Sequence, residues 1–250
     1  MSLPVILISG GTGKIGSSLV HFFAKQPVKV VFTGRNPEKV KRLTSECNVS
    51  NVQGFTIDHQ DPDSTHILMK ELIKHSMLPT HIINNVRDVS NLKLSAHGRP
   101  THEAWSQEFY LGVILPYELA MIAIEHRAPL KKIVNISSMY GLVAANPTLY
   151  ENPTTDSPIH YGIVKAAQNH LTKEMAVRLA NLGVSVNAVA YGGVEGRVSE
   201  SFKQRYAQLC PLGRMLDQNE VPGILKYLLL DADAALTGQV IAVDGGWSIW

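Results

Sequence analysis

Short apolar runs rich in β-branched residues alternate with longer segments of helical spacing along almost the whole chain. The runs are continuously apolar, which is typical of strands that are buried on both faces of a parallel sheet. Strands are expected at Val5–Ser9, Val28–Thr33, Val52–Ile57, His81–Asn84, Ile133–Ser137, Val184–Ala190 and Gln239–Val243. Helices are expected at Ile15–Lys25, Asn36–Glu46, Ser64–His75, Trp105–His126, Ile159–Asn181 and Glu220–Leu230. Alternation of this kind predicts an α/β fold.

The length and composition fit one such fold. The chain has 250 residues, of which 45% are apolar and 18% are charged. This is ordinary globular usage, and it excludes a disordered chain, a coiled coil and a fibre. A chain of this length buries roughly 70–75% of its unfolded surface, so its core needs no disulfide or metal. We therefore predict a single domain over residues 1–250, a doubly wound Rossmann-type fold with a seven-stranded parallel sheet and helices on both faces.

Charge and residue usage exclude several classes of partner. The 23 basic and 21 acidic residues give a net charge of +2, and the basic residues are scattered, which argues against a nucleic-acid partner. No apolar run reaches the ~20 residues that span a bilayer, and the N-terminus lacks the basic region of a signal peptide, so no membrane partner is expected. Cys47 and Cys210 are too few for a disulfide framework, which predicts a reducing, cytoplasmic location. The ten histidines show no metal-ligand spacing, so no metal site is expected.

A glycine-rich loop, Ser9–Gly16, connects the first expected strand to the first expected helix. Glycines let the backbone approach a pyrophosphate closely, and a helix N-terminus supplies oriented N–H donors. The alternative is a tight turn without a ligand, but the order strand, turn, helix favours a phosphate loop. The loop residues expected to bind a cofactor are Gly10, Thr12, Gly13, Lys14, Ile15 and Gly16.

The end of the second strand indicates which dinucleotide is bound. An NAD site usually carries an acidic residue there for the ribose 2′-hydroxyl. This chain has Gly34 and Arg35 instead, and Lys14 adds a positive charge that we expect nearby. Because arginine pairs with phosphate bidentately, NADP(H) is expected, with NAD(H) as the alternative if Arg35 is only a solvated surface charge. Asp58, at the end of the third strand, is expected either to accept a hydrogen bond from adenine or to cap its loop.

Tyr161 and Lys165 are spaced to lie on one helix face. A tyrosine with an ordinary pKa near 10 is a poor acid–base catalyst at neutral pH, and a nearby ammonium favours its phenolate form. The pair therefore suits proton transfer to or from a hydroxyl group. Ser138 follows a buried strand and is expected either to hold a substrate oxygen beside Tyr161 or to serve only as a turn residue.

Together these residues resemble the short-chain dehydrogenase/reductase family over essentially the whole chain. The matching segments also include Asn84-Asn85, Val186-Asn187-Ala188-Val189, Pro211-Leu212-Gly213-Arg214 and the tail from Leu236 to Trp247. The resemblance implies hydride transfer at nicotinamide C4, proton transfer by Tyr161, contact of Lys165 with the nicotinamide ribose, and orientation of the substrate oxygen by Ser138. It also implies cofactor contacts at Asn84 and Val194, and a homodimer or homotetramer.

The chain departs from the family pattern at several points. Lys14 stands where a glycine is usual, and Gly196 replaces a threonine that usually contacts the cofactor. Arg87 replaces a small residue, and it is expected either to grip an anionic substrate group or to point to solvent. Tyr110 aligns with an asparagine of the catalytic network, which places the usual water relay to Lys165 in doubt.

Two segments are expected to wall a substrate pocket. The insert Asn146–Pro158 carries three prolines and several polar residues, among them Tyr150. The segment Glu195–Arg214 carries Arg197, Arg205 and Arg214, and is expected to be a mobile lid, or otherwise a plain surface helix. Long ordered loops at a ligand-binding edge are usually functional.

Three features together also show a looser similarity to family members of surface- and flagellar-sugar (nonulosonate) biosynthesis: Asn85-Val86-Arg87, the proline-rich insert, and Tyr191-Gly192-Gly193-Val194-Glu195-Gly196-Arg197. That similarity implies a small polar, sugar-like substrate. Tyr150, Trp247 and Trp250 are expected either to stack on a sugar ring or to pack at a subunit contact. The alternatives are a reductase of an apolar carbonyl, such as an acyl thioester or a steroid, and a cofactor-binding regulator with little turnover.

Overall fold

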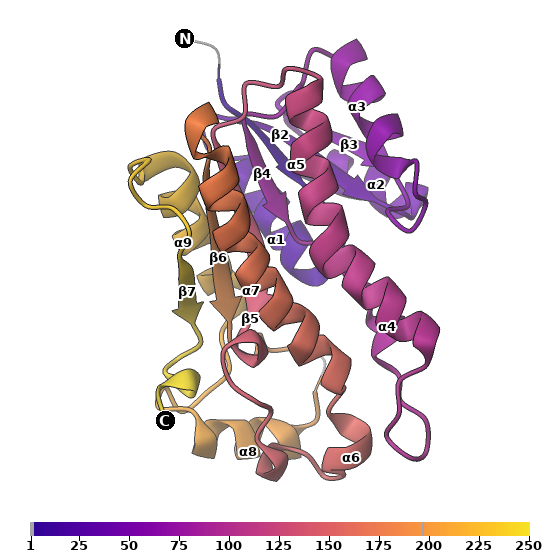
Figure 1. The fold of residues 1–250 in the computed structure, drawn as a ribbon, viewed down its shortest axis with the longest axis vertical. Helices are drawn as coiled ribbons and strands as arrows, with labels where there is room; N and C mark the ends of the chain where they lie inside the picture. Colours follow the sequence, from indigo (N-terminus) through magenta and orange to yellow (C-terminus); the bar gives the residue numbers. More distant parts are fainter. Residues whose placement is uncertain (1–2, 197) are drawn as a thin grey trace.

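The computed structural model describes residues 3–196 and 198–250. Its centre is a seven-stranded, all-parallel sheet in the order β3-β2-β1-β4-β5-β6-β7 (Figure 1). The strands are β1 Val5–Ile8, β2 Lys29–Gly34, β3 Val52–Thr56, β4 His81–Asn84, β5 Lys132–Ser138, β6 Ser185–Tyr191 and β7 Val240–Val243. The predicted doubly wound fold is confirmed, and each expected strand is present within one or two residues of its expected ends.

Helices cover both faces of the sheet. One face packs against α1 (Lys14–Phe23), α2 (Pro37–Cys47) and α9 (Val221–Lys226), whose apolar side chains form one core with the strands. The other face packs against α3 (Ser64–Lys74), α5 (Leu115–Glu125) and α7 (Ile159–Leu179), which form the second core. Figure 1 shows α5 and α7 lying side by side across this second face.

The long helix expected from Trp105 begins three residues earlier and is not uniform. Thr101 caps α4 (His102–Phe109) by accepting a hydrogen bond from the backbone N–H of Ala104. A π-helical turn, Tyr110–Ile114, then joins α4 to α5. Such turns are frequent at functional sites, and this one lies beside α7.

The segment expected to be a mobile lid contains a helix, α8 (Glu200–Leu209). Ser199 caps it by accepting a hydrogen bond from the backbone N–H of Phe202. Phe202, Tyr206 and Leu209 follow helical spacing and pack into a third, smaller core beyond the sheet. The helical spacing of these apolar residues predicts a helix here. Arg197 lies outside the described residues.

The combined helix from His102 to Glu125 is long and apolar enough to cross a membrane by length and composition alone. Much of it is buried against the sheet, as Leu111, Leu115 and Leu119 are part of the second core. Packing inside the fold therefore explains its apolar character, because helices that are buried in a protein core are apolar around much of their surface.

The strand order places the candidate site. β1 pairs with β2 on one side and with β4 on the other, so the direction of strand progression reverses at β1. In open α/β sheets, ligands bind at this reversal, beyond the carboxyl ends of the strands. The loops after β1 and β4 meet there, as the backbone N–H of Asn85 donates to Ser9 Oγ at 3.0 Å.

Candidate active site

A cleft of about 780 Å³ runs along the carboxyl edge of the sheet. That volume is typical of small-molecule and cofactor sites. It brings together most of the residues that the sequence singled out: Gly10, Thr12, Gly13, Lys14, Ile15, Arg35, Asp58, Arg87, Ser138, Tyr150, Tyr161, Lys165 and Val194.

The glycine loop is built for close approach of backbone to a ligand. Gly10 has φ +69°, a left-handed conformation that favours glycine. A Cβ on Gly16 would lie 2.2 Å from the carbonyl oxygen of Gly10, so only glycine lets the helix start so near the loop. Gly16 thus shapes the loop from behind and does not line the cleft.

The N-terminus of α1 faces this loop. Gly13 is its N-cap residue, and among the described residues no side chain caps the first turn. The first backbone N–H groups of a helix have no partner within the helix, and the helix dipole makes this end positive. These groups, beside Gly10 and Thr12, fit the pyrophosphate of a dinucleotide.

The two asparagines after β4 have different positions. Asn84, expected to contact the cofactor, is 3% exposed and lies behind the cleft wall. Its amide donates to Asn135 Oδ1 at 2.7 Å, and Asn135 donates to Thr172 Oγ1 at 2.9 Å. Asn85 lines the cleft instead, and its amide donates to the carbonyl oxygens of Ser9 and Gly10. The first asparagine therefore ties the sheet to α7, and the second holds the glycine loop.

Arg35 lies at the cleft end nearest β2 and β3, where an adenosine ribose is expected. It forms an ion pair with the buried carboxylate of Asp88, and the hydrogen bond that Arg35 donates to Asp88 raises the pKa of the guanidinium. Burial raises the pKa of Asp88, but hydrogen bonds from Arg35 and Ser90 outweigh it and hold this pKa below its usual value. No local sequence pattern marks this pair.

Two lysines line the cleft together with Arg35, the expected Lys14 and also Lys39. Lys14 Nζ donates to the carbonyl oxygen of Val194 at 3.3 Å, in the loop after β6. Lys39, in the first turn of α2, lines the cleft beside Arg35. Its position in the turn after Arg35 was the signal that sequence reasoning missed.

The catalytic candidates come from β5 and α7. Ser138 ends β5, and its Oγ accepts a hydrogen bond from the backbone N–H of Tyr140 at 3.2 Å, which leaves its own hydrogen to donate. Tyr161 and Lys165 are one turn apart on α7, with Lys165 Nζ 5.9 Å from the Tyr161 ring centroid. Lys165 is buried, and Nζ donates to the Ile136 carbonyl at 2.7 Å and to Gln168 Oε1 at 3.0 Å. Burial, with the charge of Arg87, lowers the pKa of Lys165 to about 8.

Arg87 lies over the face of Tyr161. Its guanidinium carbon is 4.2 Å from the ring centroid, a cation–π contact. Tyr140 approaches the same ring edge-on at 6.4 Å between centroids. Tyr161 is therefore flanked by two cations, Arg87 and Lys165, at the point where a substrate oxygen would bind.

Tyr110 occupies the helix position of the family's asparagine, but its hydroxyl points elsewhere. It donates to Glu118 Oε2 at 3.2 Å, and burial together with Glu118 raises the pKa of Tyr110 to about 12. Two residues earlier, Glu108 is 3% exposed, and burial raises the pKa of its carboxyl group although the charges of Arg87 and Lys165 oppose this rise. Sequence reasoning missed Glu108, since nothing local marks a buried carboxylate.

The insert and α8 form the substrate end of the cleft. Tyr150 lines it, and its hydroxyl is 2.6 Å from that of Tyr140. Arg205 of α8 donates to the Leu149 carbonyl at 2.7 Å and contacts Glu151 Oε1 at 3.4 Å. The expected lid and the expected insert wall are thus one connected unit.

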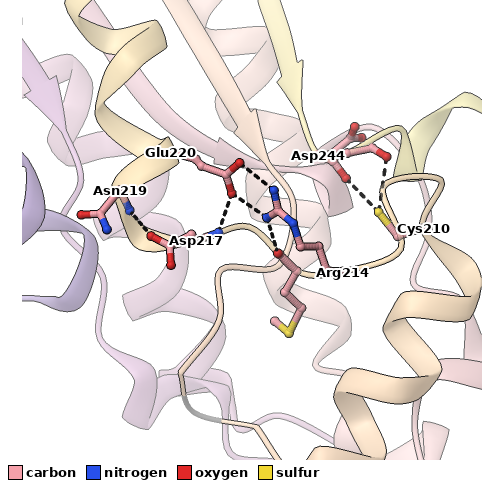
Figure 2. A network of polar contacts seen from close by, with 8 residues as sticks. Cys210, Arg214, Asp217, Asn219, Glu220 and Asp244 are labelled. Carbon is pink, nitrogen blue, oxygen red and sulfur yellow. Dashed lines mark hydrogen bonds and ion pairs between the residues drawn. The ribbon is translucent and has the colours of Figure 1, made fainter.

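The chain after α8 is held by a polar network (Figure 2). Arg214 makes two hydrogen bonds to Glu220, at 2.7 and 2.9 Å, and Cys210 Sγ lies 3.5 Å from the Asp244 carbonyl. Arg214 is consequently engaged outside the cleft lining, contrary to its expected place in the pocket wall. Trp247 is buried and stacks on Tyr206, with 4.6 Å between the ring centroids, so it packs in the third core and is not a sugar platform.

Comparisons with known proteins agree with this geometry. The family model described as enoyl-(acyl carrier protein) reductase matches residues 12–248. The post-translational flagellin modification protein A of Campylobacter coli is 24% identical to this chain, and the match covers 98% of both chains. An Arabidopsis thaliana tropinone reductase homologue is 32% identical over 97% of this chain and 90% of its own.

A solved short-chain dehydrogenase from Leptospira borgpetersenii, crystallised with NAD⁺, superposes with a TM-score of 0.86. It is 24% identical, and the match covers 99% of this chain and 94% of that one. The chain belongs to the short-chain dehydrogenase/reductase family, and it is an oxidoreductase of that family.

Proposed function

We propose that this protein is an NADP(H)-dependent oxidoreductase that interconverts an alcohol and a ketone on a small, polar, sugar-like substrate. The observation that carries the proposal is the meeting of Ser138, Tyr161 and Lys165 with the glycine loop in one cleft. Such a cleft places a proton donor beside a dinucleotide site, which is what a carbonyl reduction requires.

The side chains divide the chemistry among themselves. The nicotinamide supplies or accepts the hydride when it is bound. Ser138 donates a hydrogen bond to the substrate oxygen, and Tyr161 gives a proton to that oxygen in reduction or removes it in oxidation. Lys165, charged below its lowered pKa of about 8, favours the phenolate that forms on Tyr161.

The preference for NADP(H) rests on Arg35 and Lys39 at the ribose end, and on the absence of an acidic residue at the end of β2. The Leptospira relative holds NAD⁺, so family membership leaves this choice to local residues. Here Asp88 holds Arg35 at the cleft edge, where a 2′-phosphate would compete for the same guanidinium.

A polar, anionic substrate is supported by Arg87 and by the paired hydroxyls of Tyr140 and Tyr150. An anion held by Arg87 would lie close to the carbon that reacts beside Tyr161. The Campylobacter relative is named for flagellin modification, which agrees with sugar chemistry. The competing candidate is a reductase of apolar carbonyls, favoured by Val198, Phe202 and Met215 in the same lining.

The subunit assembly and the cellular location belong to the same proposal. Tyr117, Ile159, Ile163 and Val177 are exposed apolar residues of α5 and α7, which suits a homodimer or homotetramer. Cys47 and Cys210 are free thiols, which suits a reducing, cytoplasmic location.

A substrate panel with Tyr161→Phe tests the proposal. Purified protein is assayed by cofactor absorbance against carboxylated and phosphorylated keto-sugars and against apolar ketones and acyl thioesters. We expect turnover with the polar set, and a loss of roughly 10²- to 10⁴-fold in kcat for Tyr161→Phe, because the proton donor is gone. Tyr227→Phe changes an exposed tyrosine that does not line the cleft; it is the matched control and should retain activity. Turnover of apolar carbonyls alone would favour the competing candidate, and binding of cofactor without any turnover would favour a regulator.

A further inference from the structure

Two departures from the family pattern, Lys14 and Gly196, meet in space although they lie near opposite ends of the chain. The side chain of Lys14 leaves the glycine loop and reaches the loop after β6, where Nζ donates to the carbonyl oxygen of Val194 at 3.3 Å. A Cβ on Gly196 would overlap Nζ of the lysine and lie 3.1 Å from its Cε. The ammonium group of Lys14 therefore occupies the space that a side chain at position 196 would need.

The fold holds Lys14 at both ends. Its carbonyl oxygen accepts hydrogen bonds from Gln218 Nε2 at 2.9 Å and from Ser17 Oγ at 3.1 Å. Its ammonium group contacts Val194, which forms an isolated parallel bridge with Leu216, two positions before Gln218. Because backbone and ammonium are both tied to the same region, the charge is positioned by the fold itself, which lowers the entropy lost when a ligand binds.

The strand order gives the place of this charge along the cleft. β6 lies beside β5, which carries Ser138, whereas Arg35 follows β2 in the other half of the sheet. Lys14 and Val194 both line the cleft, so the lysine reaches from the glycine loop toward the catalytic half. A dinucleotide with its adenosine at Arg35 and its nicotinamide beside Tyr161 would have its pyrophosphate between these ends. The ammonium group is thus placed to meet the phosphate on the nicotinamide side.

We propose that Lys14 is a clamp for the pyrophosphate of the dinucleotide, and that Gly196 is the residue that makes room for it. The proposal rests on the dinucleotide site of the function proposed above and adds a binding contact to it. A lysine ammonium has three hydrogens to donate, so one group can hold the Val194 carbonyl oxygen and a phosphate oxygen together. Since NAD(H) and NADP(H) both carry a pyrophosphate, Lys14 contributes affinity for either cofactor and no preference between them.

Two fragments of the cofactor separate Lys14 from Arg35. ADP-ribose carries the pyrophosphate without a 2′-phosphate, and adenosine 2′,5′-bisphosphate carries the 2′-phosphate with only the adenosine-side phosphate of the linker. We expect Lys14→Ala to weaken ADP-ribose binding by roughly 10- to 30-fold, through loss of a charge-assisted hydrogen bond, and to change binding of the bisphosphate by less than about twofold. Arg35→Leu should show the reverse. Titration calorimetry measures both dissociation constants, and Lys25→Ala, exposed after α1 and outside the cleft lining, is the control.

A double-mutant cycle tests the contact between Lys14 and Gly196. We expect Gly196→Ala to weaken ADP-ribose binding, because the new Cβ displaces the ammonium group. In a Lys14→Ala background the same substitution should weaken it about fivefold less, because no ammonium is left to displace. Gly196 has φ +132°, so an alanine there is strained, but this strain acts in both backgrounds and cancels in the cycle.

The outcomes separate the clamp from the oxidoreductase function. Unchanged ADP-ribose binding in a folded Lys14→Ala protein would overturn the clamp, as would equal losses for the two fragments. Additive losses in the cycle would overturn the role of Gly196. Lys14→Gln is the second variant if Lys14→Ala folds poorly, and it should show the same selective loss. Absence of turnover by the wild type on any carbonyl would overturn the function and leave the clamp standing, since the binding measurements need no turnover.

Discussion

At the scale of single residues, the properties of the cleft depend on what each of its charged side chains contacts. Arg35 and Arg87 are both exposed cations of the cleft lining, yet their surroundings differ. Arg35 is held by the buried carboxylate of Asp88, and Arg87 lies over the ring of Tyr161. In the proposed function, the first selects the cofactor and the second selects the substrate.

Arg35→Leu should weaken NADPH binding by roughly 10- to 100-fold and leave NADH binding within about twofold. A hydrogen bond between two charged groups contributes about 1.5–3 kcal/mol, and only NADPH carries the 2′-phosphate that would make it. Titration calorimetry with both cofactors measures this difference. Arg42→Leu, on α2 and paired with Glu46 at 3.5 Å, is the matched control. Equal loss for NADH and NADPH would contradict the role given to Arg35.

At the scale of elements, the substrate end depends on the joining of two segments distant in sequence. The insert contributes Leu149, Tyr150 and Glu151, and α8 contributes Phe202 and Arg205. Figure 1 shows α6 and α8 together at the end of the molecule away from the N-terminus. Because the two segments contact one another, movement of either changes the same pocket wall.

Arg205→Met should raise KM for the substrate several-fold and leave the dissociation constant for cofactor unchanged. Methionine keeps most of the apolar stem but removes the hydrogen bonds to Leu149 and Glu151. Steady-state kinetics and cofactor titration give the two values. Lys203→Met on the same helix removes contacts to Glu195 and Glu200 only, and serves as the control. A rise in both constants for Arg205→Met would indicate general damage to the fold.

At the scale of the whole molecule, two buried histidines link stability to pH. His59 Nε2 forms a hydrogen bond with Thr33 Oγ1 at 2.8 Å, and His81 Nδ1 forms one with Thr80 Oγ1 at 2.6 Å. Burial lowers the pKa of His59 and of His81 from 6.5 to about 4. Both rings are therefore neutral in the folded protein at a pH where they are charged in the unfolded chain.

The free energy of unfolding should be insensitive to these rings above pH 6.5 and should fall as the pH drops toward 4. In this window the unfolded chain binds protons that the fold excludes. Each of these buried rings contributes roughly 3 kcal/mol to this loss. Urea unfolding at several pH values measures it. His59→Gln should flatten the dependence, whereas His66→Gln, on the exposed face of α3, should not; equal curves for all three proteins would refute the assignment.

The chain's local patterns predicted the strands, the glycine loop, and the pairing of Tyr161 with Lys165. These follow from neighbours: apolar runs make buried strands, and residues four apart share a helix face. The structure departed from the sequence expectation at Asn84 and Trp247, whose partners lie far along the chain, and at Arg214, which pairs with Glu220 six positions later. Lys14 and Val194 are 180 positions apart, and Arg35 and Asp88 are 53 apart.

The sequence by itself thus determined the family fold and the candidate reacting groups, Ser138, Tyr161 and Lys165. Only the tertiary structure decided which charges face one another, which asparagine lines the cleft and where the buried Glu108 lies. The physical reason is that hydrogen bonding and electrostatic effects depend on distance and burial in space, and folding alone brings remote residues within that reach.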